Sequence, residues 1–104
     1  MARFDVYRHP DAALRKSTPF LLDIQNDYIS GLETRVVMPF RSLKTMGPPL
    51  RDLNPLLDID GTQVVLDAAA IAAFPASELR TPVTNLRARA DLVANALDTL
   101  FGSY

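Results

Sequence analysis

Short runs of alternating apolar and polar residues fill the first two-thirds of the chain, a pattern typical of β-strands. The first run, residues 4–7, ends at the turn-forming His9-Pro10-Asp11. The second, residues 20–25, places side chains on two opposite faces: Phe20, Leu22 and Ile24 on one, and Leu21, Asp23 and Gln25 on the other. The third, residues 34–39, is rich in β-branched residues. We expect it to end at Pro39 or to lie at a sheet edge, because proline cannot donate to a strand ladder.

Turn-forming residues separate the remaining runs. Asp60-Gly61 lies between the apolar runs 56–59 and 62–66, which predicts a β-hairpin with a type I′ turn. Residues 42–49, with one glycine and two prolines, are expected to form a loop. The pattern of residues 68–74 leaves helix and strand open, and residues 77–81 are expected to form a last short strand.

From residue 85 onwards the apolar spacing changes to that of a helix. The apolar residues at intervals of four and three are Leu86, Ala90, Val93, Leu97 and Leu100. Thr84 or Asn85 is suited to cap the start of a helix over residues 85–101, and Gly102 fits the position just past its end. The predicted fold is therefore mainly β with one C-terminal helix, an α+β protein with an antiparallel sheet.

Length and composition place this fold in one domain covering residues 1–104. The absence of cysteine excludes disulfides and thiolate metal sites. No stretch approaches the ~20 apolar residues of a membrane span, and the N-terminus does not resemble a secretory signal. The net charge of −1, with scattered lysine and arginine, disfavours direct binding to nucleic acid. We expect a cytoplasmic protein.

Candidate catalytic and metal-binding residues are few. His9, the one histidine, is interpreted as a solvated turn residue, because no nucleophile motif accompanies it. Asp58, Asp60 and Asp67 are candidate metal ligands, but they lack the spacing of a known site and the turn already explains Asp60. We therefore expect no catalytic residue, metal or cofactor, and favour an interaction module over an enzyme.

A polar row at a spacing of two is formed by Asp23, Gln25 and Asp27. As an enzyme site it would supply paired carboxylates for acid–base chemistry. As a structural feature it is the solvated face of a strand, or it anchors the loop that follows. Because no third chemical group accompanies the row, the structural interpretation is favoured.

The end of the chain carries large apolar residues at Leu100, Phe101 and Tyr104, where chains usually become polar. Leu100 and Phe101 could complete the apolar stripe of the helix. Exposed aromatic residues near a terminus otherwise indicate a partner surface, because they bury a large area at low entropic cost. Two such helices ending side by side across a dimer axis would form one apolar projection.

The order of these segments resembles the CcdB toxins of toxin–antitoxin pairs over nearly the whole chain. The matching stretches are residues 4–7, 22–29, 34–39 and 55–59, Pro75 with the strand after it, and Asn95-Ala96-Leu97 leading to Phe101. The most specific part is the row Asp23-x-Gln25-x-Asp27, followed by a basic, β-branched strand that ends in proline.

This resemblance implies an SH3-like antiparallel sheet with a small side sheet and a C-terminal helix, assembled as a homodimer. It implies a non-catalytic, plasmid-maintenance type of toxin that binds the DNA gyrase A subunit and traps gyrase on cleaved DNA. A CcdA-like antitoxin, with a disordered segment that folds over the toxin, would neutralise it. The gyrase contacts carried over by position are Tyr28, Ile29, Asn95, Phe101, Gly102, Ser103 and Tyr104.

The tail departs from the family pattern. The best-known members end in aromatic-Trp-Gly-Ile, whereas this chain ends in Phe101-Gly102-Ser103-Tyr104 and has no tryptophan. Losing a stacking aromatic at the centre of an interface costs on the order of 2 kcal/mol, or about thirtyfold in affinity. One alternative is therefore a relative with weakened or lost gyrase poisoning that mainly binds antitoxin. A MazF-like ribonuclease is a further alternative, less favoured because the composition shows neither a basic groove nor a catalytic constellation.

Overall fold

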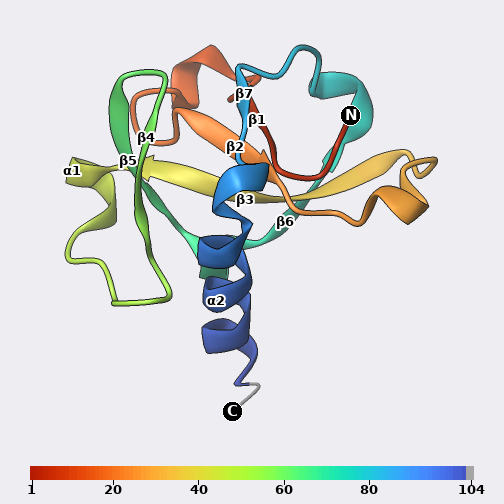
Figure 1. The fold of residues 1–104 in the computed structure, drawn as a ribbon. Coiled ribbons are helices and arrows are strands. Elements are labelled where there is room, and N and C mark those ends of the chain that lie inside the picture. The colour runs from red at the N-terminus through yellow and green to blue at the C-terminus, as the bar shows by residue number, and fades with distance from the viewer. Residues whose placement is uncertain (103–104) are drawn as a thin grey trace.

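The computed structural model describes residues 1–102 and shows a curled antiparallel sheet with one long helix across it (Figure 1). The strands are β1 (Asp5–Arg8), β2 (Phe20–Asp23), β3 (Thr34–Ser42), β4 (Leu56–Ile59), β5 (Thr62–Leu66), β6 (Ala72–Pro75) and β7 (Thr84–Asn85). The α-helices are α1 (Leu43–Met46) and α2 (Ala90–Phe101). The predicted mainly β, α+β fold with a C-terminal helix is confirmed.

Strand β3 organises the sheet, because it is long enough to change partners along one edge. The strand order is β4-β5-β3-β2-β1-β7, with β6 on β3 as well. The first half of β3 pairs with β6 (Val37 opposite Ala72), and the second half pairs with β5 (Phe40 opposite Leu66). The β4–β5 hairpin thus extends the same seven-stranded sheet, which it joins through the second half of β3.

Pro39 lies inside β3, so the expectation that the strand ends there was wrong. The strand continues to Ser42 with β2 on one side. The carbonyl of Pro39 accepts the amide of Asp67 at 2.9 Å, beyond the end of β5. Because the N and C=O of a β residue face the same side, the missing N–H of Pro39 faces the gap between β5 and β6. A proline is tolerated at this position because no ladder hydrogen bond is required of it.

The predicted hairpin turn at Asp60-Gly61 is confirmed. Both residues have positive φ, 52° and 84°, as a type I′ turn requires. The Asp58 carboxylate accepts the amide of Gly61 at 2.9 Å and so closes the turn. The predicted loop over residues 42–49 contains the single turn of α1, whose start is capped by Ser42.

The segment after β5 differs from the expectation. Residues 72–75 form β6, while the strand expected at residues 77–81 is absent, and Ala76–Glu78 is a 3-10 turn. The pairing gives the reason: Pro75 lies opposite Thr34, the first residue of β3. Residues after Pro75 have run past the end of β3 and therefore have no strand to pair with.

Helix α2 begins later than the predicted residue 85. Thr84 and Asn85 instead pair with Val6 and Asp5 of β1, and the Arg87–Arg89 turn leads into the helix. Strand pairing therefore overrides the helical apolar pattern at this point. The predicted end is confirmed, because Gly102 adopts the left-handed conformation with φ 65°.

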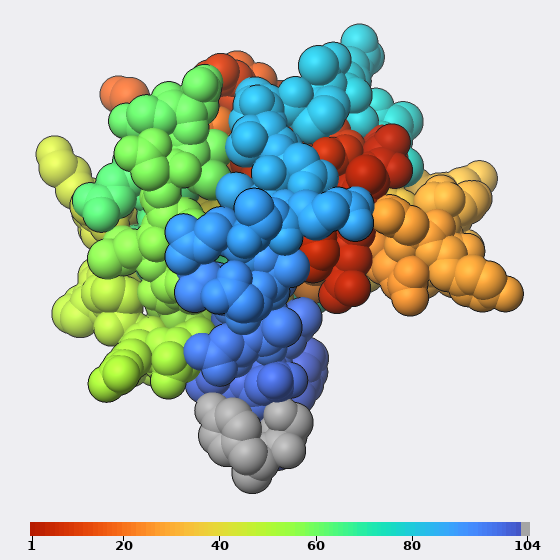
Figure 2. Space-filling view, viewed as in Figure 1, coloured from red at the N-terminus to blue at the C-terminus, as the bar shows by residue number. Residues whose placement is uncertain are grey.

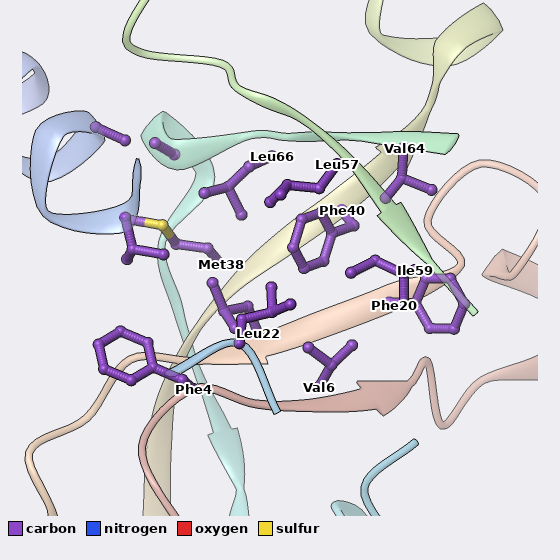
Figure 3. Close-up of a cluster of buried hydrophobic side chains, with 14 residues drawn as sticks. Phe4, Val6, Phe20, Leu22, Met38, Phe40, Leu57, Ile59, Val64 and Leu66 are labelled. Carbon is purple, nitrogen blue, oxygen red and sulfur yellow. The ribbon is translucent and has the colours of Figure 1, made fainter. Parts of the chain in front are cut away.

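Two apolar clusters hold the sheet, one on each face. The larger cluster lies under α2 and is shown in Figure 3; its fully buried members include Val6, Leu22, Met38, Phe40, Ile59 and Leu66. Val93 and Ala96 are the buried residues of α2 and belong to this cluster. The smaller cluster, Tyr7, Leu21, Val37 and Leu79, covers the opposite face. Strand β2 is therefore buried on both sides, and its polar residues must find partners inside the protein.

Within residues 1–102, the helices are all too short or too polar to cross a lipid bilayer.

Candidate functional site

The predicted contact residues fall into two groups at separate places on the surface. Tyr28 and Ile29 lie in the loop between β2 and β3, which projects on the right of Figure 1. Phe101 and Gly102 end helix α2, which projects at the bottom. Figure 2 shows the two projections with the body of the molecule between them. The structure therefore does not bring the two groups together within one chain.

Apolar side chains are exposed in both groups. Tyr28 is 89% exposed, Ile29 46% and Phe101 72%. Phe101 therefore does not complete the core stripe of α2, which was one interpretation of the sequence. Large apolar groups held in water are available for burial against a partner, where aromatic residues contribute most of the binding free energy.

The β2–β3 loop is held in a compact turn. Asp27–Ile29 forms a single 3-10 turn, and the Asn26 side chain accepts the amide of Tyr28 at 3.0 Å. The side-chain oxygen of an asparagine caps the start of a helix in the same way. The backbone amide of Tyr28, at the start of the turn, therefore has a hydrogen-bond acceptor. Tyr28 projects from a defined backbone rather than from a loose segment.

A buried ion pair lies directly beneath this loop. The Asp23 carboxylate accepts hydrogen bonds from Nε of Arg35 at 2.7 Å and from Nη2 of Arg35 at 3.0 Å. Both side chains are fully buried. The hydrogen bond to Asp23 raises the pKa of the Arg35 guanidinium, so the guanidinium stays charged. Among the described residues, Nη1 of Arg35 has no hydrogen-bond partner. Sequence reasoning missed Arg35, because a single arginine in a β-branched strand does not reveal its partner. In the strand register Asp23 lies opposite Val37, two residues along β3 from Arg35.

Gln25 joins the loop to the sheet with both ends of its side-chain amide. Its Nε2 donates to the carbonyl of Ile29 at 3.1 Å, and its Oε1 accepts the amide of Val36 at 3.1 Å. Only 5% of Gln25 is exposed, and Asp23 is completely buried. The prediction that the polar row anchors the following loop is confirmed, while a solvated strand face is wrong.

Asp27 ties the same loop to the N-terminus. Its carboxylate accepts the amide of Arg3 at 2.8 Å and lies 3.8 Å from Nη2 of Arg35 and 3.9 Å from Nη2 of Arg87. Asp27 therefore links the loop to the segments before β1 and α2. The three members of the row thus hold one loop, and the carboxylates of Asp23 and Asp27 both face Nη2 of Arg35.

The helix-end group differs among its members. Asn95 is exposed, and its Nδ2 donates to Asp52 at 3.1 Å, so a partner would compete for this amide. Gly102 closes α2 by donating its amide to the carbonyl of Asp98 at 2.9 Å. The predicted contacts at Ser103 and Tyr104 lie outside the described residues. Phe101 is thus the described residue of this group with the most apolar area to offer.

His9 is not solvated, contrary to the sequence interpretation. It is 6% exposed, its Nδ1 accepts the amide of Asp11 at 3.0 Å, and its ring meets Phe74 edge to face at 5.8 Å. Burial lowers the pKa of His9. The turn folds His9 back onto the smaller cluster, where the neutral ring packs.

The aspartates weighed as metal ligands have structural partners. Asp58 closes the hairpin turn, and Asp67 pairs with Nε of Arg41 at 3.1 Å. Residues 1–102 contain no group of three or more candidate ligands close enough to share a metal ion. The turn that explains Asp60 is confirmed, with Asp60 at φ 52°.

The predicted contact residues offer apolar area and backbone groups on a hydrogen-bonded loop and a projecting helix, an arrangement suited to non-covalent binding. A family model described as CcdB protein matches residues 3–102. The chain belongs to the CcdB family. The match includes every strand and both helices, from β1 to the end of α2. A comparison with curated proteins finds no match. Within the CcdB match lie Tyr28, Ile29, Asn95, Phe101 and Gly102.

Proposed function

We propose that this CcdB-family chain is the toxin of a type II toxin–antitoxin system, acting in the cytoplasm by trapping DNA gyrase on cleaved DNA. The gyrase A subunit would be contacted through the loop group and the helix-end group: Tyr28, Ile29, Asn95, Phe101, Gly102, Ser103 and Tyr104. The toxin would form a homodimer and be neutralised by a CcdA-like antitoxin.

One observation carries this proposal beyond family membership. Phe101 ends a helix that projects from the body of the protein, and 72% of it is exposed although it is a large apolar residue. In a homodimer whose two helices end side by side, two copies of Phe101 would form one apolar projection. Such a projection buries aromatic area against a partner with little loss of side-chain entropy.

The mechanism requires no covalent chemistry. A dimer that binds only the open conformation of the gyrase gate would shift the population toward that conformation, in proportion to its differential affinity. Gyrase held open cannot reseal the DNA that it has cut. The antitoxin would act by covering the same toxin dimer with a segment that folds on binding.

The direct test is expression of the chain in a bacterium whose own gyrase is present. Growth arrest with accumulation of gyrase-linked cleaved DNA is expected. Normal growth and no cleaved complex, at a confirmed level of soluble protein, would contradict the proposal. Leu50→Ala serves as the control for truncating an exposed apolar residue. Leu50 is 63% exposed but lies outside both contact groups, so this variant should remain toxic.

The altered tail favours a second candidate function, a CcdB-family protein that binds antitoxin but no longer poisons gyrase. Truncation of residues 102–104 separates the two candidates. A poison loses toxicity on truncation while keeping its fold and its antitoxin binding. A protein of the second kind shows no toxicity before or after truncation, and its antitoxin binding is unchanged.

A further inference from the structure

A cavity of about 620 Å³ opens at the edge of the sheet, away from both contact groups. It is lined by Tyr7 and Arg8 of β1, by Pro10 and Arg15 of the following loop, and by Ser77, Glu78, Arg80 and Thr81 after β6. The segments that form it lie at the top of Figure 1, whereas the C-terminal end of α2 lies at the bottom. The proposed gyrase contacts therefore do not account for it.

The charge of this cavity is opposite to that of the chain. Three arginines and one glutamate line it, while the whole chain has a net charge of −1. Positive charge concentrated in a concave site attracts anions more strongly than the same charge spread over a surface. The cavity is thus a local basic site that the overall composition does not reveal.

The arginines of this cavity have guanidinium hydrogen-bond donors that are not used within residues 1–102. Arg15 is held in place by donating Nε to the carbonyl of His9 at 2.7 Å, which leaves its two terminal nitrogens free of hydrogen bonds within residues 1–102. The side chains of Arg8 and Arg80 make no hydrogen bond or ion pair in the described part of the chain. Glu78 is likewise not within ion-pair distance of any of them. Three exposed guanidinium groups thus line one cavity, and none of them is paired with a carboxylate within residues 1–102.

From this arrangement we propose that the cavity binds a small molecule bearing phosphate groups, such as a diphosphate. Guanidinium groups bind phosphate oxygens through pairs of parallel hydrogen bonds, and a diphosphate concentrates more than one negative charge in a small volume. The hydroxyl groups of Ser77 and Thr81 add donors at the same rim. The volume lies within the range of about 300–1,000 Å³ typical of small-molecule sites. The carboxylate of Glu78 opposes the anion and sets a limit on affinity.

The test is titration of the whole chain with inorganic pyrophosphate at low ionic strength. Binding is measured by calorimetry and by changes in the amide chemical shifts. Saturable binding of one pyrophosphate per chain is expected, with shifts centred on residues 7–15 and 77–81. Arg80→Gln should weaken binding about tenfold, the loss expected for a charge-assisted hydrogen bond. Glu78→Gln should tighten it severalfold, because the opposing charge is removed.

Arg51→Gln is the matched control, because Arg51 is an exposed arginine outside the cavity. It should change the affinity less than twofold. No saturable binding, or an equal loss in Arg51→Gln and Arg80→Gln, would overturn the proposal. A single-stranded oligonucleotide or a glutamate-rich peptide that binds the cavity more tightly than pyrophosphate would overturn it as well, since the site would then serve a polymer.

Discussion

Arg35 of β3 and Asp23 of β2 form a bidentate ion pair in the interior, with Nε–Oδ2 and Nη2–Oδ1 distances of 2.7 and 3.0 Å. Neither side chain has any exposed surface. Burying two charges is costly, so such a pair contributes little net stability compared with apolar residues, yet loss of one partner is severe. The pair therefore acts as a constraint that fixes β2, β3 and the loop between them in one geometry.

Asp23→Asn should destabilise the protein strongly. The substitution keeps the side-chain volume but leaves the charge of Arg35 buried without its main partner, which costs roughly 3–5 kcal/mol in free energy of unfolding. Urea denaturation measures the loss. Asp60→Asn serves as the control, because asparagine also tolerates the positive φ of that exposed turn position, and a change within about 0.5 kcal/mol is expected. Equal losses in the two variants would show that the buried pair does not constrain the fold.

Gln25→Ala should loosen the loop without unfolding the sheet. The amide of Val36 donates to the Gln25 side chain at 3.1 Å, whereas the amide of Ile24 donates to the backbone carbonyl of Val36 at 3.0 Å. Loss of one hydrogen bond, about 1–1.5 kcal/mol, should speed hydrogen exchange of the Val36 amide about tenfold. The Ile24 amide is the internal control and should change much less. If both amides exchange faster by the same factor, the effect is global and Gln25 has no particular role in the loop.

His9 should make stability depend on pH between about pH 7 and the lowered pKa of its imidazole. Burial beside Phe74 lowers the pKa of His9 below its ordinary value of 6.5, although Asp11 acts in the opposite direction. Above about pH 7 the ring is largely neutral in both the folded and the unfolded state and adds little pH dependence. Below it the unfolded chain binds the proton more tightly, so stability falls until the folded-state pKa is passed.

His9→Asn is the variant that checks this dependence, because its side-chain oxygen offers the amide of Asp11 an acceptor that does not titrate in this range. Free energies of unfolding at pH 7.5 and pH 5.5 would be compared for both proteins. The natural chain should lose more stability than the variant over this interval, because only the natural chain carries a group whose pKa is lowered by folding. A parallel fall in both proteins would assign the loss to other groups.

The local elements were predictable where the chain decides its own conformation. The Asp60-Gly61 turn follows from the positive φ that both residues tolerate, and the end of α2 follows from Gly102. The family resemblance, and with it the candidate contact positions Tyr28 and Phe101, could also be drawn from the order of the segments.

The features that the sequence did not predict depend on residues distant in the chain. Pro39 is tolerated inside β3 because β5 and β6 leave a gap opposite it, and the burial of His9 depends on Phe74. The partner of Arg35 lies 12 residues away on another strand, and the arginine cavity combines the β1–β2 loop with the segment after β6. None of these relationships leaves a local periodicity or motif from which it could be read.

Phe101→Ala and Val93→Ala should separate partner binding from folding on a single helix. Val93 is 1% exposed in the main core, so truncation leaves a cavity and should cost roughly 2 kcal/mol in free energy of unfolding. Phe101 is 72% exposed, and its truncation should change that free energy by less than about 0.5 kcal/mol.

Toxicity and gyrase-linked cleavage should show the opposite order, with the larger loss in Phe101→Ala. Loss of an aromatic residue at the centre of an interface lowers affinity by about thirtyfold or more, which should abolish the phenotype in Phe101→Ala. Val93→Ala should remain toxic wherever soluble folded protein accumulates. A Phe101→Ala protein that is as toxic as the natural chain would remove the helix end from the proposed gyrase contacts.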